Sequence, residues 1–284
     1  MPADAGGGGL IRPTFAMLVR GMREYRAAVL PVTMIAILAL GVFTFLSIAD
    51  EVAEGEIHTI DETLFLIFRS ASDMADPLGP PWLEEAAAEI TALGGYPVIL
   101  LAVLVVTGLL LITRRYGPAL YTVVSVASGA AVSQVLKDHF ERPRPDIVEH
   151  LDAVHTASFP SGHAMVGTVA YLTLAALVTR FFDDGWVRAY VIAVAVAMSV
   201  LIGLTRIYLG VHWPSDVAAG WALGTAWASF TWLFVSALQY RRHRKAMRDE
   251  ADGTKAAAGG FSGEEPFRPM PPRRSTEQDV TEAR

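Results

Sequence analysis

The sequence predicts an all-α fold, an integral membrane bundle of six transmembrane helices. Of its 284 residues, 52% are hydrophobic, and the mean hydropathy of +0.38 is high for a soluble protein. The apolar residues fall into blocks whose lengths approach the roughly 20 residues that a bilayer span needs. These blocks are residues 27–48, 97–113, 118–137, 163–181, 188–207 and 216–239. A soluble helical bundle is the alternative, but its surface helices would carry a charged face, which these blocks lack.

The individual blocks differ in character. The first block, AAVLPVTMIAILALGVFTFLSI, is the most apolar, and it begins too late and runs too long for a cleaved secretory signal. The third block, PALYTVVSVASGAAVSQVLK, is the least apolar, and its small residues suit close packing between helices. In the sixth block, GWALG (Gly220 to Gly224) favours close packing inside the bundle over dimerisation.

The charges predict the orientation of the helices. Six spans would put both termini on one side, and most Arg and Lys residues near the expected span ends fall on that side. They are Arg12, Arg20, Arg23, Arg26, Arg114, Arg115, Arg180, Arg188, Arg241, Arg242, Arg244 and Lys245. The connection 49–96 has eleven acids and a single basic residue, Arg69. The positive-inside rule therefore predicts cytoplasmic termini and an external 49–96 connection. We expect the protein to lie in a bacterial cytoplasmic membrane, with its active site on the periplasmic side.

Three regions are expected along the chain. Residues 1–26 form a cytoplasmic N-terminal segment, residues 27–240 the six-helix domain, and residues 241–284 a cytoplasmic tail. The tail begins with RRHRK (241–245), which is interpreted as an anchor at the anionic inner leaflet and not as a nucleic-acid site. Residues 246–284 have few large apolar groups and are expected to be disordered. The chain has no cysteine, which excludes disulfides, zinc-thiolate sites and cysteine nucleophiles.

Three polar clusters lie at the ends of the expected spans. They are Lys137 and Arg144 after the third span, Pro160-Ser161-Gly162-His163 before the fourth, and Arg206, His212 and Asp216 between the fifth and sixth. Counting spans places all three on the external side, where the positive-inside rule predicts few cations. An anionic ligand held there would explain the exception.

The residue types in these clusters suit phosphoryl transfer. Lys137, Arg144 and Arg206 are cations fit for a phosphate, Ser161 supplies a hydroxyl, and the N–H groups near Gly162 open a helix. Asp216 can fix the tautomer of His212, four residues before it, and leave the other ring nitrogen free to attack phosphorus or take a proton. His163 can protonate a leaving oxygen. The cations can replace a metal, so no cofactor or metal is expected.

These clusters resemble the three motifs of the type-2 phosphatidic acid phosphatase superfamily, whose members include vanadium haloperoxidases. The motifs read KDHFERPRP (137–145), PSGH (160–163) and TRIYLGVHWPSD (205–216), with the family's order and spacing. Thr205 departs from the usual Ser but keeps a hydroxyl. Over about residues 27–240, the resemblance implies a metal-independent phosphatase with His212 as the nucleophile that becomes a phosphohistidine, Asp216 as its orienting partner and His163 as general acid and then base. It implies a phosphate cradle of Lys137, Arg144, Ser161, Gly162 and Arg206.

A site at the external membrane surface predicts a lipid substrate. The expected partners are the bilayer and a phosphorylated lipid such as phosphatidic acid, phosphatidylglycerol phosphate or a polyprenyl diphosphate, and no nucleic acid. A vanadate-dependent haloperoxidase is a first alternative, disfavoured because such relatives are soluble. A non-catalytic lipid-phosphate binding or transport protein is a second, but it would need no nucleophilic histidine.

Several residues keep two interpretations. Arg142 either adds to the positive electrostatic field of the site or faces lipid headgroups. Segment 57–72 brings Leu64, Phe65, Ile67 and Phe68 together, either as an interfacial helix that guards lipid access or as a linker helix. His139, His150 and His155 match no motif position and are interpreted as loop histidines.

Overall fold

The computed structural model describes residues 11–70, 73–146 and 156–259, and the regular structure in this part of the chain is all α-helical. The helices are α1 (Ile11–Glu54), α2 (His58–Leu66), α3 (Pro81–Ala92), α4 (Tyr96–Ile112), α5 (Tyr116–Phe140), α6 (Gly162–Val178), α7 (Gly185–Tyr208) and α8 (Pro214–Gly259). The chain divides into a compact unit of residues 1–236 and a second unit of residues 237–284.

The helices agree with the expected apolar blocks, which fall in α1 and in α4 to α8. In the described residues, four helices are long and apolar enough to span a membrane: Val29–Glu54 of α1, α5, α7 and Pro214–Thr254 of α8. The pair α3 and α4, bent by 45° at its break, makes a fifth if it crosses as one span, and α6 is a shorter apolar helix. An all-helical membrane architecture is thus confirmed, whereas the number of six spans stays a prediction.

The connection 49–96 is more regular than an external loop. Helix α1 continues to Glu54, and α2 and α3 follow it before α4 begins at Tyr96. Helix α3 packs against α7, and the break that separates α3 from α4 contains Gly94. A Cβ at Gly94 would lie 2.4 Å from Ile202 Cγ2, so only glycine fits this contact with α7. The break therefore lets α3 stay packed on α7 while α4 turns toward α5.

The tail also differs from the sequence interpretation. Residues 246–259 were expected to be disordered, but α8 continues through them to Gly259. The physical reason is composition, because Ala, Arg, Glu, Lys and Met favour a helix and the first proline of the tail comes only at residue 266. Residues 1–10 and 260–284, which include the Gly-rich N-terminus and the rest of the tail, lie outside the described residues.

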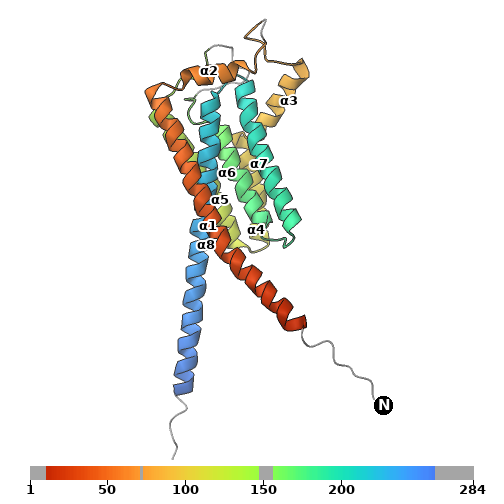
Figure 1. Cartoon of the computed structure of the whole chain (residues 1–284), viewed down its shortest axis with the longest axis vertical. Helices are drawn as coiled ribbons and strands as arrows, with labels where there is room; N and C mark the ends of the chain where they lie inside the picture. Colours follow the sequence, from red (N-terminus) through yellow and green to blue (C-terminus); the bar gives the residue numbers. More distant parts are fainter. Residues whose placement is uncertain (1–10, 71–72, 147–155, 260–284) are drawn as a thin grey trace, which may run out of the picture. The chain divides into compact units, whose positions relative to one another are not determined.

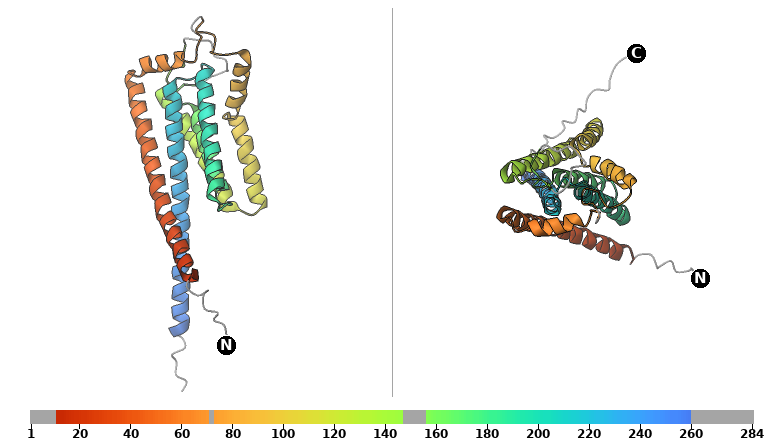
Figure 2. Two further views of the ribbon diagram at one scale, coloured as in Figure 1. Left: turned by 45° about the vertical axis from the view of Figure 1, so that its right-hand side comes forward. Right: turned by 90° about the horizontal axis from the view of Figure 1, so that it is seen from above.

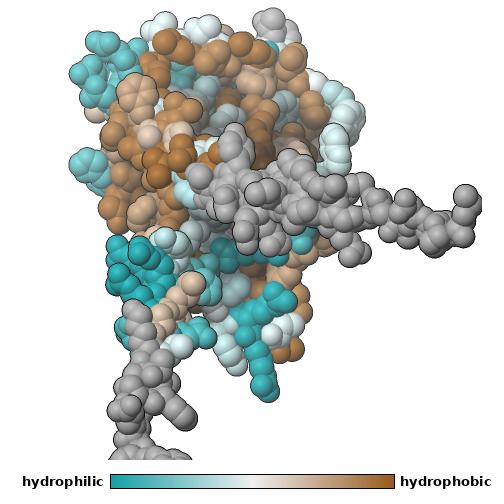
Figure 3. Space-filling view, turned by 60° about the horizontal axis from the view of Figure 1, so that its bottom comes forward, coloured by the Kyte–Doolittle hydropathy of each residue, from teal (hydrophilic) through white to brown (hydrophobic). Residues whose placement is uncertain are grey.

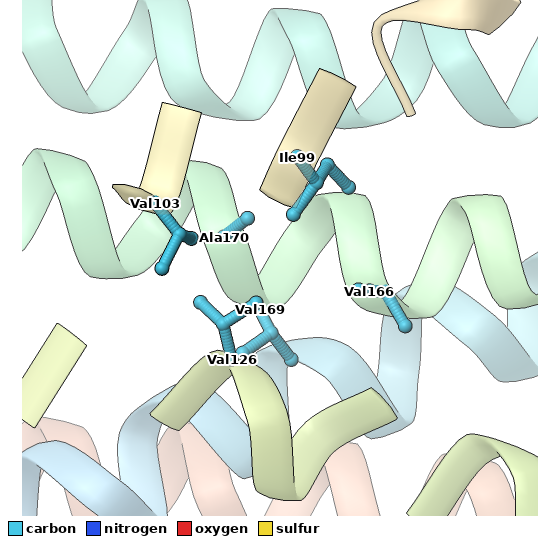
Figure 4. Close-up of a cluster of buried hydrophobic side chains, with 6 residues drawn as sticks. All are labelled: Ile99, Val103, Val126, Val166, Val169 and Ala170. Atoms are coloured by element: carbon cyan, nitrogen blue, oxygen red, sulfur yellow. The ribbon is translucent and has the colours of Figure 1, made fainter. Parts of the chain in front are cut away.

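Helix α6 lies between α5 and α7 and packs against both, while α4 packs against α5 (Figures 1 and 2). Figure 4 shows one apolar cluster of this core, in which side chains from α4, α5 and α6 meet. Its members are Ile99, Val103, Val126, Val166, Val169 and Ala170. The outward flanks of the helices are also apolar, as the brown surface in Figure 3 shows, and Leu40, Leu104 and Leu120 are each more than half exposed. Such exposed apolar flanks are typical of lipid contact.

Helix α8 approaches α6 closely through two glycines. A Cβ at Gly220 would lie 2.9 Å from both Ala164 Cβ and Ser161 O, and one at Gly224 would lie 2.7 Å from Met165 O. This is the close packing that the GWALG pattern predicts. It brings the first turn of α8 beside the first turn of α6.

Candidate active site

The polar clusters of the sequence meet at one end of the helices. The end of α5, the start of α6, the end of α7 and the start of α8 lie at the same end of the first unit as α2 (Figure 1). Backbone hydrogen bonds join the segments: Ser161 N donates to Asp216 O at 3.0 Å, and Ser158 N donates to Arg142 O at 2.9 Å. The three motifs are therefore parts of one site.

His212 and Asp216 lie in contact at the start of α8. His212 is in the turn that precedes the helix and is 2% exposed, and Asp216 is in the first turn and fully buried. The His212 Nδ1 atom lies 3.4 Å from Asp216 Oδ2, which also accepts a hydrogen bond of 2.9 Å from Trp213 N. Pro214 starts the helix, where its missing N–H costs nothing, and an acidic side chain is favoured in the first turn. The local sequence thus places the carboxylate beside the ring.

The neighbours of His212 favour one tautomer of its ring. The Arg144 Nη1 atom lies 3.3 Å from His212 Nε2, and a guanidinium has only donors. The two contacts together favour the tautomer with the lone pair on Nε2 and the proton on Nδ1, which faces the Asp216 carboxylate. Burial lowers the pKa of His212 well below its usual 6.5, and the charges of Arg144, Lys137, Arg206 and His163 lower it further. The ring is thus held neutral, which is the nucleophilic form.

Three cations surround this imidazole. Lys137 Nζ donates to Ala157 O at 2.5 Å, Arg144 Nε donates to Thr156 O at 2.9 Å, and Arg206 Nη1 donates to Thr91 Oγ1 of α3 at 3.2 Å. Lys137 and Arg206 are 5% and 2% exposed. Gathering buried like charges is costly, and a bound anion would offset that cost because charge-assisted hydrogen bonds to phosphate are strong.

The start of α6 supplies backbone donors to the same place. Ser161 caps the helix, with its Oγ accepting from Ala164 N at 3.5 Å, and α6 begins at Gly162. The first N–H groups of a helix have no partner within the helix and favour an anion. A Cβ at Gly162 would lie 3.3 Å from the hydroxyl oxygen of Tyr96 and 3.6 Å from Ser133 Oγ. These two polar neighbours belong to no motif, and the sequence interpretation missed them.

His163 follows Gly162 and is half-buried. Its Nε2 lies 3.7 Å from the position that a Cβ at Gly95 would occupy, so the ring rests against the break between α3 and α4. It is also one of the groups whose charge acts on His212. The structure thus brings all eight candidate residues of the sequence interpretation to one site.

Thr205 and the remaining histidines occupy other places. The Thr205 hydroxyl donates to Ile202 O of its own helix at 2.7 Å. His139 lies in the last turn of α5, with its ring 5.1 Å from that of Phe140, so its interpretation as a loop histidine was wrong; the segment is helical up to Phe140. His150 and His155 lie outside the described residues. In the described ranges, no three His, Asp or Glu side chains are grouped closely enough to hold a metal ion.

Arg142 and Asp61 are the main site residues that the sequence interpretation did not assign. Arg142 Nη1 donates to Asp216 Oδ1 at 2.6 Å, and Arg142 Nη2 donates to Asp61 Oδ2 of α2 at 2.8 Å. Of the two interpretations of Arg142, the structure therefore favours contact with the site. A signal for Asp61 was present: it lies four residues before Phe65 on one face of α2, and an acid on a buried apolar face needs a partner.

Comparisons with known proteins agree on one family. Residues 118–240 match the family model described as the PAP2 superfamily. Phosphatidylglycerophosphatase B of Bacillus subtilis is 30% identical over 185 residues, which cover 63% of this chain and 85% of that protein. An undecaprenyl-diphosphatase of Sulfolobus acidocaldarius is 35% identical over 133 residues, which cover 44% of this chain and 59% of that protein.

The fold has a matching solved structure. The crystal structure of a transmembrane PAP2 type phosphatidylglycerolphosphate phosphatase from Bacillus subtilis aligns with a TM-score of 0.59 and 26% identity. The alignment covers 71% of this chain and 96% of that chain. The family match spans α5 to α8 up to Tyr240, and so it contains every candidate residue of the site.

Proposed function

This chain belongs to the PAP2 superfamily, and from that premise we propose that it hydrolyses the phosphomonoester or diphosphate of a membrane lipid. The observation that carries this proposal is the state of His212. Its Nε2 lone pair faces the cation cluster, while its Nδ1 faces the buried Asp216 carboxylate. A neutral nucleophile with cations around it is what phosphoryl transfer requires.

The proposed reaction gives each of these side chains a role. His212 Nε2 attacks phosphorus, the bond from phosphorus to the leaving oxygen breaks, and His163 gives that oxygen a proton. A water then attacks the phosphohistidine, His163 takes a proton from it, and the N–P bond breaks to release inorganic phosphate. Lys137, Arg144 and Arg206 bind the equatorial oxygens with the Ser161 hydroxyl and the Gly162 N–H, and they stabilise the charge of the transition state without a metal.

The substrate is a lipid whose tail stays in the bilayer. The apolar flanks of the helices support this, since they surround the elements that carry the site. Relatives named phosphatidylglycerophosphatase and undecaprenyl-diphosphatase suggest two headgroups to test first. We propose phosphatidylglycerol phosphate as the leading candidate, because the protein named phosphatidylglycerophosphatase B matches 63% of this chain and the undecaprenyl-diphosphatase matches 44%.

The proposed topology has six spans within residues 27–240, with α3 and α4 forming one and α6 another. Both termini are cytoplasmic, and the site faces the external side. The positive-inside rule supports this orientation, because the arginines of the α4–α5 and α6–α7 connections lie at the other helix ends from the site.

A panel of lipid phosphates, assayed in detergent with EDTA present, tests the proposal. We expect phosphate release from at least one lipid and its loss in His212→Ala. Bromide oxidation with vanadate and peroxide, without phosphate release, would instead identify a haloperoxidase. Saturable lipid-phosphate binding without turnover would identify a binding or transport protein.

A further inference from the structure

We propose that Arg142, held in place by Asp61 of α2, is a positioning residue for Asp216 and through it for His212; this inference rests on the proposed function. One guanidinium reaches two carboxylates that come from helices far apart in sequence. Its Nη1 lies 2.6 Å from Asp216 Oδ1, and its Nη2 lies 2.8 Å from Asp61 Oδ2. Neither Arg142 nor Asp61 is a candidate catalytic residue of the sequence motifs.

The burial of these groups makes the arrangement specific. The side chains of Asp61, Asp216 and Arg142 are 1%, 0% and 11% exposed. A buried carboxylate without a counter-charge is costly, so both acids depend on the same cation. The planar fork of arginine satisfies two acceptors in fixed directions, which a lysine point charge does not.

Ser215 completes the contact between α2 and α8. Its N donates to Asp61 Oδ1 at 2.8 Å, and its hydroxyl bonds Asp61 Oδ2 at 2.5 Å. Arg142 Nη1 also donates to Ser215 Oγ at 2.8 Å. Asp61 is therefore held by three donors, and it fixes the position from which Arg142 reaches Asp216.

The consequence for His212 arises because the two carboxylate oxygens of Asp216 have different partners. Oδ1 accepts from Arg142, and Oδ2 accepts from Trp213 N and faces His212 Nδ1. The Arg142 contact fixes the plane of the carboxylate and keeps Oδ2 directed at the ring. Arg142 therefore helps to keep the proton of His212 on Nδ1 and the lone pair on Nε2.

Helix α2 is the element that carries this support. Its inner face buries Asp61 and also Phe65, whose ring lies 5.7 Å from that of Trp213. Its outer face exposes Ile60 and Leu64 by 60% and 43%, and Ile67, which follows the helix, is 62% exposed. Phe65, suggested by the sequence as part of a surface that guards lipid access, is thus part of the core instead. Helix α2 therefore supports the site through the contacts of its inner face. Its apolar outer face is available to the membrane interface.

Steady-state kinetics of three variants test the proposal. We expect Arg142→Gln to lower kcat roughly 10- to 100-fold, since a hydrogen bond to a charged group contributes about that much, with KM changed less than about threefold. Arg142→Lys should recover part of kcat by restoring the charge. Asp61→Asn should lower kcat less than Arg142→Gln. Arg188→Gln, which removes a partly exposed arginine paired with Asp183, is the matched control and should leave both constants unchanged.

A double-mutant cycle separates positioning from a general structural role. If Arg142 acts through Asp216, adding Arg142→Gln to Asp216→Asn should lower kcat by less than about twofold more. Losses that multiply in full would overturn the proposal. Thermal melting in detergent, with and without vanadate, identifies any variant that fails to fold.

NMR on isotope-labelled histidine can identify the tautomer of His212 without any turnover of substrate. We expect a single Nδ1–H tautomer in the unmodified chain and a mixture in Arg142→Gln. An unchanged tautomer in Arg142→Gln would overturn the positioning role even if the enzyme were active. If no lipid were hydrolysed but the tautomer shifted as expected, the proposed function would fail and the positioning role would stand.

Discussion

The helices of the first unit carry Arg–Asp ion pairs at both ends, but the pairs differ in their exposure to water. At the site end, Arg142 joins two aspartates that are 1% and 0% exposed. At the other end, Arg188 near the start of α7 pairs at 3.1 Å with Asp183 of the α6–α7 connection, and these side chains are 35% and 109% exposed. The chemistry is identical, but only one pair is removed from water.

This difference shows where the chain accepts an energetic cost. An exposed ion pair contributes little, about 0–1 kcal/mol. A buried pair carries a desolvation penalty that its attraction barely offsets, and breaking it leaves an uncompensated charge. Among the residues that the structure describes, the buried charges gather at the site end, which is a sign of function there.

The largest effect is expected for the ring of His212. His212→Ala should reduce phosphate release by roughly a thousandfold or more, because it removes the nucleophile. His139→Ala is the matched control, since His139 lies at the end of α5 against Phe140, and it should retain activity within about twofold. Comparable losses in the two variants would contradict the assignment of the site.

A packing change next to the site should have the next largest effect. Gly220→Ala places a methyl 2.9 Å from Ser161 O and Ala164 Cβ, and such overpacking should destabilise the protein by about 1–3 kcal/mol and lower kcat. Gly167→Ala on α6 meets no atom closer than 3.8 Å, so it should be neutral or slightly stabilising. Melting temperatures in detergent measure both, and equal shifts would show that the α6–α8 contact is looser than described.

A third prediction concerns pH. Burial and nearby cations lower the pKa of His212. Below about pH 6.5 the imidazole therefore takes up a proton in the unfolded chain but stays neutral in the folded chain. Stability from this group is therefore unaffected above that pH and falls as the pH drops below it. NMR of the ligand-free protein should find the His212 ring neutral at pH values where a model peptide histidine is charged. A ring that titrates at the peptide value would contradict its buried, cation-rich surroundings.

The smallest effect is expected at the exposed pair. Arg188→Gln should change stability by less than about 1 kcal/mol, and added salt should weaken even that. Melting temperatures of Arg188→Gln and Arg142→Gln, measured side by side at two salt concentrations, check the contrast. Similar shifts in the two variants would remove the distinction between the two ends.

The sequence predicted the all-helical membrane fold and the eight candidate residues, because long apolar blocks and fixed motif spacings are local signals. The bend at Gly94 was missed because it depends on contact with Ile202 of α7, which no local pattern encodes. Arg142 stayed ambiguous because its role depends on Asp61, which is distant in sequence. Phe65 was misjudged because α2 carries apolar side chains on two of its faces. Only the contact of Phe65 with Trp213 shows which face is buried.

Trapping of the covalent intermediate would identify the residue that attacks phosphorus. The enzyme would be mixed with a lipid carrying radiolabelled phosphate, quenched rapidly in alkali and digested, and the labelled peptide identified. We expect acid-labile label on His212 in the unmodified chain and none in His212→Ala. Rapid turnover without label on His212, or label on another residue, would contradict this expectation.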